Sequence, residues 1–130
     1  MKGGRVLKTM KTMKIMIFEK SDILRTKMAN VLSSLNKIGM TMITSDFDMV
    51  VNGTGGCAPD ILIMDIGLAQ SYKKELAALK ADNPGIKLML HSEMVDEEFN
   101  GCARSLGADV FFDFMELVKE VSKSLKVKAR

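Results

Sequence analysis

Asp65 ends a run of four apolar residues, 61–64, and is the residue of this chain best placed to do chemistry. A continuous apolar run of this length predicts a central parallel strand that is buried on both faces. The carboxylate would then lie at the carboxyl end of the strand, where open α/β sheets bind ligands. A single acid there can be a nucleophile, a metal ligand or a helix cap. The following Ile66 and Gly67 do not resemble a helix start, which argues against the cap.

The other strand-like segments also end on polar residues, namely Glu19 and Lys20, His91 and Ser92, and Asp113. In a parallel sheet all carboxyl ends open on one edge. With the first, third and fourth strands side by side, we expect Glu19, Lys20, Asp65 and Ser92 to converge there. Successive side chains of a strand point to opposite faces, so His91 is predicted to point away from Ser92 and to have a structural role.

Strand and helix patterns alternate along the chain. Strands are predicted at residues 15–18, 40–43, 61–64, 88–90 and 110–112. The first helix is predicted to begin at Ser21 or Asp22 and to end at Gly39, with an apolar face of Leu24, Met28, Val31, Leu35 and Ile38. The alternation predicts an α/β, doubly wound (βα)5 flavodoxin-like fold, in which helices cover both faces of a five-stranded parallel sheet.

Charge is distributed unevenly over the 130 residues, of which 47% are hydrophobic and 27% charged. Residues 1–13 contain four basic residues and no acid, and the remainder has 15 basic against 16 acidic residues. We therefore predict a basic, disordered leader over 1–13 and a single domain over 14–127, with no nucleic-acid partner. No apolar run is long enough to cross a membrane, and Cys57 and Cys102 lack metal or redox spacing, so a cytoplasmic protein is expected.

Residues 14–126 resemble the receiver domain of two-component response regulators. The segments that carry the resemblance are KIMIFE, PDILIMDIG, IKLMLHS and GADVFF, and Ser92 has the family's spacing of 15 residues to Gly107. The resemblance implies that Asp65 is a phospho-acceptor, and that Ser92 and Phe111 form the switch that responds to the phosphoryl group. It also implies that any Mg2+ would be held by Glu19, Asp65 and Gly67.

Two positions depart from the family pattern. Lys20 stands where the family has its second acid, and Phe114 stands where it has a lysine. Phosphoryl transfer needs positive charge, mainly from Mg2+ and lysine, and Mg2+ needs hard oxygen ligands. Lys20 can pair with Asp65 or Glu19 in place of a metal, or it can meet a phosphoryl group. We therefore expect a degenerate, pseudo-receiver-like acidic pocket without a cofactor.

The predicted function is that of a stand-alone signalling module of a two-component or phosphorelay system. It would act by contact with a sensor kinase, a phosphotransfer protein or a downstream target, and not as an enzyme. A homodimer would use the face of the fourth helix, fifth strand and fifth helix, where the charged residues are Glu97, Glu98, Arg104, Lys119, Lys123 and Lys126. One alternative is a conventional response regulator phosphorylated at Asp65. A small-ligand-binding flavodoxin-like protein is less favoured, because no phosphate-binding loop follows the first strand.

Overall fold

Five parallel strands form one sheet in the order β2-β1-β3-β4-β5 in the computed structural model of the chain. The structure describes residues 13–33, 39–52, 59–92 and 97–129, so most of the predicted leader lies outside the described residues. The strands are β1 (Met13–Phe18), β2 (Gly39–Thr44), β3 (Ile61–Asp65), β4 (Lys87–Ser92) and β5 (Val110–Asp113). As predicted, the first, third and fourth strands are neighbours in the sheet.

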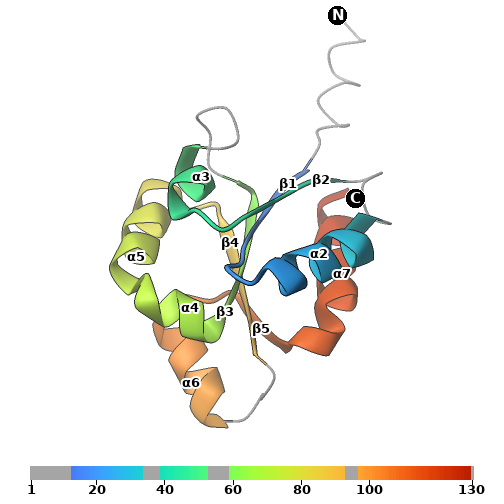
Figure 1. The fold of residues 1–130 in the computed structure, drawn as a ribbon. Coiled ribbons are helices and arrows are strands. Elements are labelled where there is room, and N and C mark those ends of the chain that lie inside the picture. Colours follow the sequence, from blue (N-terminus) through green and yellow to red (C-terminus); the bar gives the residue numbers. More distant parts are fainter. Residues whose placement is uncertain (1–12, 34–38, 53–58, 93–96, 130) are drawn as a thin grey trace, which may run out of the picture.

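The helices cover both faces of the sheet (Figure 1). They are α2 (Asp22–Leu32), α3 (Phe47–Asn52), α4 (Ile66–Ser71), α5 (Lys73–Asp82), α6 (Glu97–Ser105) and α7 (Leu117–Ala129), the last preceded by a 3-10 turn, η2 (Phe114–Glu116). Helices α2 and α7 lie on one side of the sheet, and α3 to α6 lie on the other (Figure 1). This arrangement confirms the doubly wound, flavodoxin-like fold. No helix in the described ranges combines the length and apolar character needed to span a membrane.

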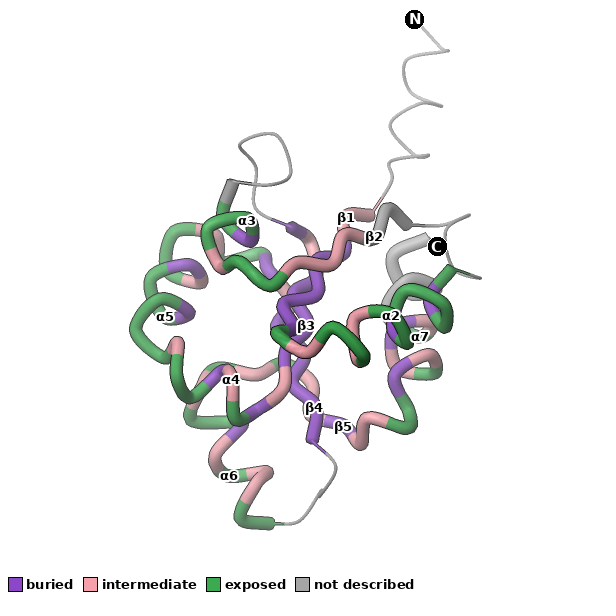
Figure 2. Tube along the Cα trace, viewed as in Figure 1, coloured by how far each residue is buried: buried purple, intermediate pink, exposed green. Residues whose placement is uncertain are grey.

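The core has two halves, one on each face of the sheet. Met16, Phe18 and Met64 pack on the α3–α6 side, whereas Ile17 and Ile63 pack on the side of α2 and α7. Figure 2 shows the central strands buried along their length between the two helical layers. Because both faces of β1 and β3 are covered, their sequences read as continuous apolar runs and not as alternating ones.

Helix α2 begins where the sequence predicts. The Ser21 hydroxyl accepts a hydrogen bond from the Leu24 amide at 3.2 Å, which caps the helix. The predicted apolar face is wrong in part: the buried residues are Met28 and Leu32, whereas Val31 is 45% exposed. Met28 and Leu32, which are four residues apart, face the sheet. Val31 points toward the gap between α2 and α7. Leu35 and Ile38 lie outside the described residues.

Three connections also differ from expectation. Helix α2 ends at Leu32, and Gly39 is the first residue of β2 instead of the end of the helix. Helix α4 begins directly after β3, where no helix was expected, and breaks at Tyr72 before α5. After α6, Gly107 has a φ of 87°, a left-handed conformation that glycine adopts without strain at the end of a helix.

Candidate functional site

Glu19, Asp65 and His91 form a row across three neighbouring strands. Phe18 pairs with Met64 in the β1–β3 ladder, which places the next residues, Glu19 and Asp65, at the same level. Asp65 pairs with His91 in the β3–β4 ladder. By alternation all three side chains lie on the face of α2 and α7. The residue beside Asp65 in the ladder is therefore His91 and not Ser92.

Asp65 caps helix α4. Its Oδ2 accepts hydrogen bonds from the amide of Gly67 at 2.8 Å and from that of Leu68 at 3.3 Å. The sequence argument against a helix cap at Asp65 was wrong, because helix α4 starts at Ile66 without an intervening loop. The cap satisfies two amides that have no partner within the helix, and it fixes the orientation of the carboxylate.

Glu19 is deeply buried at this edge, with 7% of its surface exposed. Its Oε2 accepts a hydrogen bond from the Ser21 amide at 3.1 Å, whereas Oε1 is buried without a partner. The guanidinium of Arg25 donates to the main-chain carbonyl of Glu19 at 2.9 Å and also pairs with Asp22. Arg25 therefore holds the turn after β1 through the main chain of Glu19 and the side chain of Asp22.

Lys20 points to the opposite side of the sheet from this acidic row. Its ammonium lies 5.7 Å from the centre of the Tyr72 ring, a cation–π contact. Tyr72 in turn stacks on Phe47 with centroids 5.0 Å apart and meets Phe18 edge-on. Among the ion pairs of the described residues, none joins Lys20 to Glu19 or Asp65. The structure thus places Lys20 on an aromatic cluster, in an arrangement that the sequence did not indicate.

His91 is buried, with 3% of its surface exposed and its Nε2 without a hydrogen-bond partner. Burial lowers the pKa of His91 to about 4, and the negative charge of Asp65 offsets only part of this effect. The imidazole is therefore neutral at pH 7. Its ring contacts Phe112 and Phe114, with centroids at 5.9 Å and 5.1 Å. These contacts confirm the predicted direction of the side chain.

The two predicted switch residues lie on the other face of the sheet. Ser92 is buried at the end of β4, and Phe111 packs, partly exposed, against the core half on the α3–α6 side. Leu90 pairs with Phe111 in the β4–β5 ladder, and Ser92 pairs with Asp113. Ser92 and Phe111 therefore share a face of neighbouring strands, while Phe114 lies with His91 on the α2–α7 side.

Two of the oxygen atoms that the resemblance assigns to Mg2+ accept hydrogen bonds from the chain itself. Asp65 Oδ2 is occupied by two amides, and the Gly67 carbonyl accepts a hydrogen bond from the Ser71 hydroxyl at 3.4 Å, along the axis of α4. Within the described residues no group of three or more His, Cys, Asp or Glu side chains is arranged to hold a metal ion. Mg2+ is usually held by one or two carboxylates and several waters, so Glu19 and the second oxygen of Asp65 are the side-chain oxygens left for it at this edge. Mg2+ binding by Glu19, Asp65 and Gly67 stays a prediction that the resemblance implies.

Sequence reasoning missed two residues that shape the site. The Tyr72 ring contacts the ammonium of Lys20, but nothing in the sequence around Tyr72 predicts this contact. For His91 the sequence predicted a structural role. Its ladder pairing with Asp65 was missed, although the register implies it once β3 and β4 are neighbours.

The solved structures most similar to this chain include several response regulators. They include a response regulator from Thermotoga maritima (TM-score 0.70, 14% identity, 88% of this chain and 98% of that one covered). A second is HP1043, an orphan response regulator of H. pylori (TM-score 0.66, 16% identity, 91% and 97% covered). A third, from Burkholderia pseudomallei, has a phosphorylated aspartic acid and a calcium ion (TM-score 0.67, 14% identity, 90% and 68% covered).

Comparisons of the sequence itself gave no such likeness. No protein-family model matches the chain, and no curated protein matches it. At these identities the structural likeness establishes the fold: the chain has the fold of response regulator receiver domains.

Proposed function

We propose that this chain is a receiver-like signalling module that acts through protein contact, with a pocket that does not support Mg2+-dependent phosphorylation. The observation that carries the proposal is the ring contact between His91 and Phe114 beside Asp65. At the position where receiver domains have a lysine, this chain has a neutral aromatic ring packed on a neutral imidazole.

The position of Lys20 supports the same conclusion. Transfer of a phosphoryl group to a carboxylate requires positive charge on the equatorial oxygens in the transition state. Lys20, which follows Glu19 in the sequence, lies on Tyr72 on the other side of the sheet. Among the described residues no ion pair joins Asp65 to a lysine, while its Oδ2 caps helix α4.

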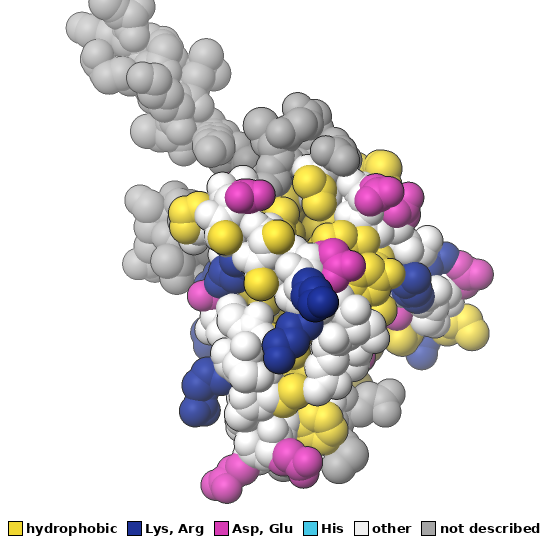
Figure 3. Space-filling view, turned by 90° about the vertical axis from the view of Figure 1, so that its left-hand side faces the viewer, with side chains coloured by type: hydrophobic (Ala, Val, Ile, Leu, Met, Phe, Trp, Pro, Cys, Tyr) yellow, Lys and Arg dark blue, Asp and Glu magenta, His cyan; other side chains and the backbone are white. Residues whose placement is uncertain are grey.

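Exposed apolar side chains near the same edge favour contact with another protein. Ile23 follows the end of β1 and Met115 follows the end of β5, and both are exposed. Single exposed apolar side chains are common on protein surfaces, and it is the position of these two near the strand ends that supports a binding site for a partner. Met49 and Val51 of α3 are exposed too, and Figure 3 shows apolar side chains among basic and acidic ones on the side of α3 and α5. We expect a kinase, a phosphotransfer protein or a downstream target to bind at the edge that Ile23 and Met115 border.

Intact mass spectrometry after incubation with acetyl phosphate and Mg2+ tests the proposal. The wild-type chain is expected to keep its mass. The variant Lys20→Asp/Phe114→Lys restores the second acid and the lysine, and is expected to gain one phosphoryl group. The same variant with Asp65→Asn is the matched control and should gain none. If the wild-type chain gains a phosphoryl group that Asp65→Asn loses, the alternative of a conventional response regulator holds instead.

For a homodimer we propose the face of α6, β5 and α7. Arg104 is exposed on α6, and on α7 the ammonium of Lys119 lies 3.6 Å from Glu116 of η2 and that of Lys123 lies 3.8 Å from Glu120. These exposed pairs are weak, so the lysines can exchange partners across an interface. Sedimentation should show that Arg104→Glu weakens the dimer. A dimer that Arg104→Glu leaves intact, with crosslinks only to α2, would place the interface elsewhere.

A further inference from the structure

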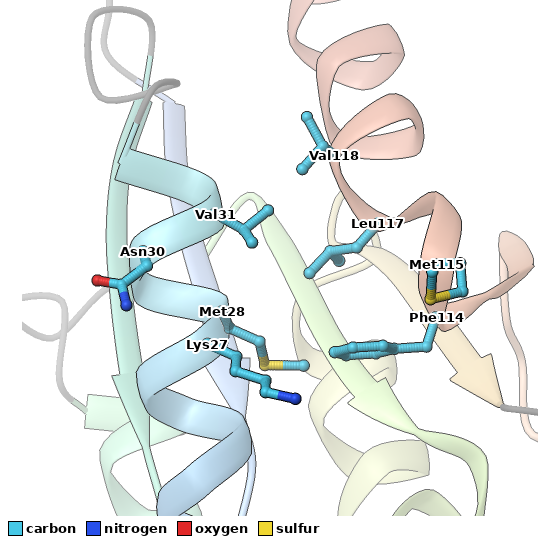
Figure 4. A pocket seen from close by; sticks show the side chains of 8 residues that line it. All are labelled: Lys27, Met28, Asn30, Val31, Phe114, Met115, Leu117 and Val118. Carbon is cyan, nitrogen blue, oxygen red and sulfur yellow. The ribbon is translucent and has the colours of Figure 1, made fainter.

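A pocket lies in the groove between α2 and α7, and neither Glu19 nor Asp65 lines it. Its volume is about 390 Å3, within the range of pockets that bind small molecules. Figure 4 shows Met28 and Val31 of α2 facing Phe114 and Leu117 across the gap. Apart from Lys27 and Asn30, the side chains that line it are apolar.

One positive charge accompanies this apolar surface. The side chain of Lys27 extends from α2 toward the gap in front of Phe114 (Figure 4). The ion pairs of the described residues do not include Lys27. A bound neutral molecule would take water from the ammonium and give it no counter-charge, which costs free energy. A single negative charge would compensate that loss.

We propose that the groove between α2 and α7 binds a small apolar molecule with one carboxylate, which pairs with Lys27 while the hydrocarbon part lies between Met28 and Leu117. The walls can adapt to such a molecule. Met28 and Met115 have flexible, polarisable side chains, and Met115 is 88% exposed, so a ligand would cover apolar surface that now contacts water. A phosphate ester is a poorer fit, because Lys27 is the one cation among the described residues that line the groove.

The pocket shares a wall with the row that contains Asp65. Phe114 lines the groove and also contacts the ring of His91, which pairs with Asp65 in the sheet. A molecule that contacts Phe114 is therefore separated from the His91 imidazole by the Phe114 ring alone. His91 is the one histidine of the chain, so its ring protons give a single, assignable signal that reports on the groove.

The test is an NMR titration of the full chain with sodium octanoate, with 1-octanol and octylammonium as neutral and positive counterparts. Octanoate is expected to produce saturable shifts of the methyl groups of Val31, Leu117 and Val118 and of the His91 ring protons. The alcohol is expected to bind at least fivefold more weakly, and the ammonium more weakly still. Equal binding of the three molecules, or octanoate shifts confined to another surface, would overturn the proposal.

Two variants and a control separate the charge from the cavity. Lys27→Gln, at an exposed position, should weaken octanoate at least fivefold and leave 1-octanol unchanged. Lys73→Gln removes the same charge from exposed α5 on the opposite side and should change neither. Val118→Trp should fill the groove and abolish the shifts. If Lys27→Gln binds octanoate as the wild type does, or if the methyl shifts follow protein concentration and not octanoate, the groove is not this site but a surface for another occupant, such as a second copy.

Discussion

His91 is the ladder partner of Asp65, so a buried imidazole lies next to the carboxylate at the end of β3. The ring is neutral because burial lowers the pKa of His91 to about 4, despite the nearby negative charge. Its Nε2 has no hydrogen-bond partner in the described structure. This pair makes the edge of the sheet sensitive to acid, and it gives Asp65 a neutral neighbour instead of a cation.

The first prediction is that His91 makes the fold less stable as the pH falls below 6.5. Between pH 6.5 and 4 the unfolded chain binds a proton on His91 that the folded chain does not bind, so the free energy of unfolding rises with pH in this window. From pH 7 to pH 5 we expect a loss of about 2 kcal/mol from this residue. Urea unfolding at several pH values measures it.

The control for this prediction is His91→Leu, which keeps a neutral side chain at the site. Other groups still titrate in the variant, so only the difference between the two pH profiles belongs to His91. From pH 7 to pH 5 the free energy of unfolding of the wild type should fall by about 2 kcal/mol more than that of the variant. Parallel profiles for the variant and the wild type would show that the histidine is as easily protonated in the folded chain as in the unfolded one.

The second prediction concerns Asp65 as a helix cap. Asp65→Ala should lower the free energy of unfolding by about 1 kcal/mol, because the amides of Gly67 and Leu68 lose their acceptor. Asp65→Asn keeps a capping oxygen and should cost only a few tenths of a kcal/mol. Both variants remove the charge, so the difference between them isolates the cap. Equal stability of the two variants in urea would mean that the cap contributes nothing.

The third prediction concerns Mg2+. The amide signals of Glu19, Asp65 and Gly67 should not shift saturably when Mg2+ is added to millimolar concentration. Lys20→Asp removes a cation from the end of β1 and puts in its place the acid that the receiver pattern has there, so it should introduce saturable shifts, since Mg2+ binds through a few carboxylates and completes its shell with water. Lys73→Asp makes the same charge change on exposed α5 and should not. Localised, saturable shifts in the wild-type chain would show that the pocket accepts the metal after all.

The sequence predicted the sheet because both faces of its central strands are covered. The runs around Ile17 and Ile63 could only be buried strands, and the order of strands and helices then allowed few topologies. The side-chain contacts at the edge were less predictable. Lys20 has several partners within reach, and a sequence does not rank a carboxylate against the ring of Tyr72. Helix α4 was missed because its cap is also the last residue of a strand.

The last prediction concerns the switch residues Ser92 and Phe111. In a working receiver domain the phosphoryl group draws the hydroxyl toward it, and the aromatic ring moves into the space that is vacated. A ligand shifts such an equilibrium only by its difference in affinity for the two states. Here Ser92 and Phe111 lie on the side of the sheet opposite Asp65 and His91. With Phe114 in place of a lysine, a phosphoryl group would have few contacts that favour an active state.

We therefore expect beryllofluoride with Mg2+, which mimics a phosphoryl group, to leave the ring signals of Phe111 and the amide of Ser92 unchanged. The variant Lys20→Asp/Phe114→Lys is the positive control, because it restores both charges and should show a shift at Phe111 that Asp65→Asn removes. A wild-type chain that responds as this variant does would have a switch, and its partner would then distinguish two states of the module. No response would mean that partners meet the same surface whether or not phosphoryl donors are present, and a signal would have to arrive by another route.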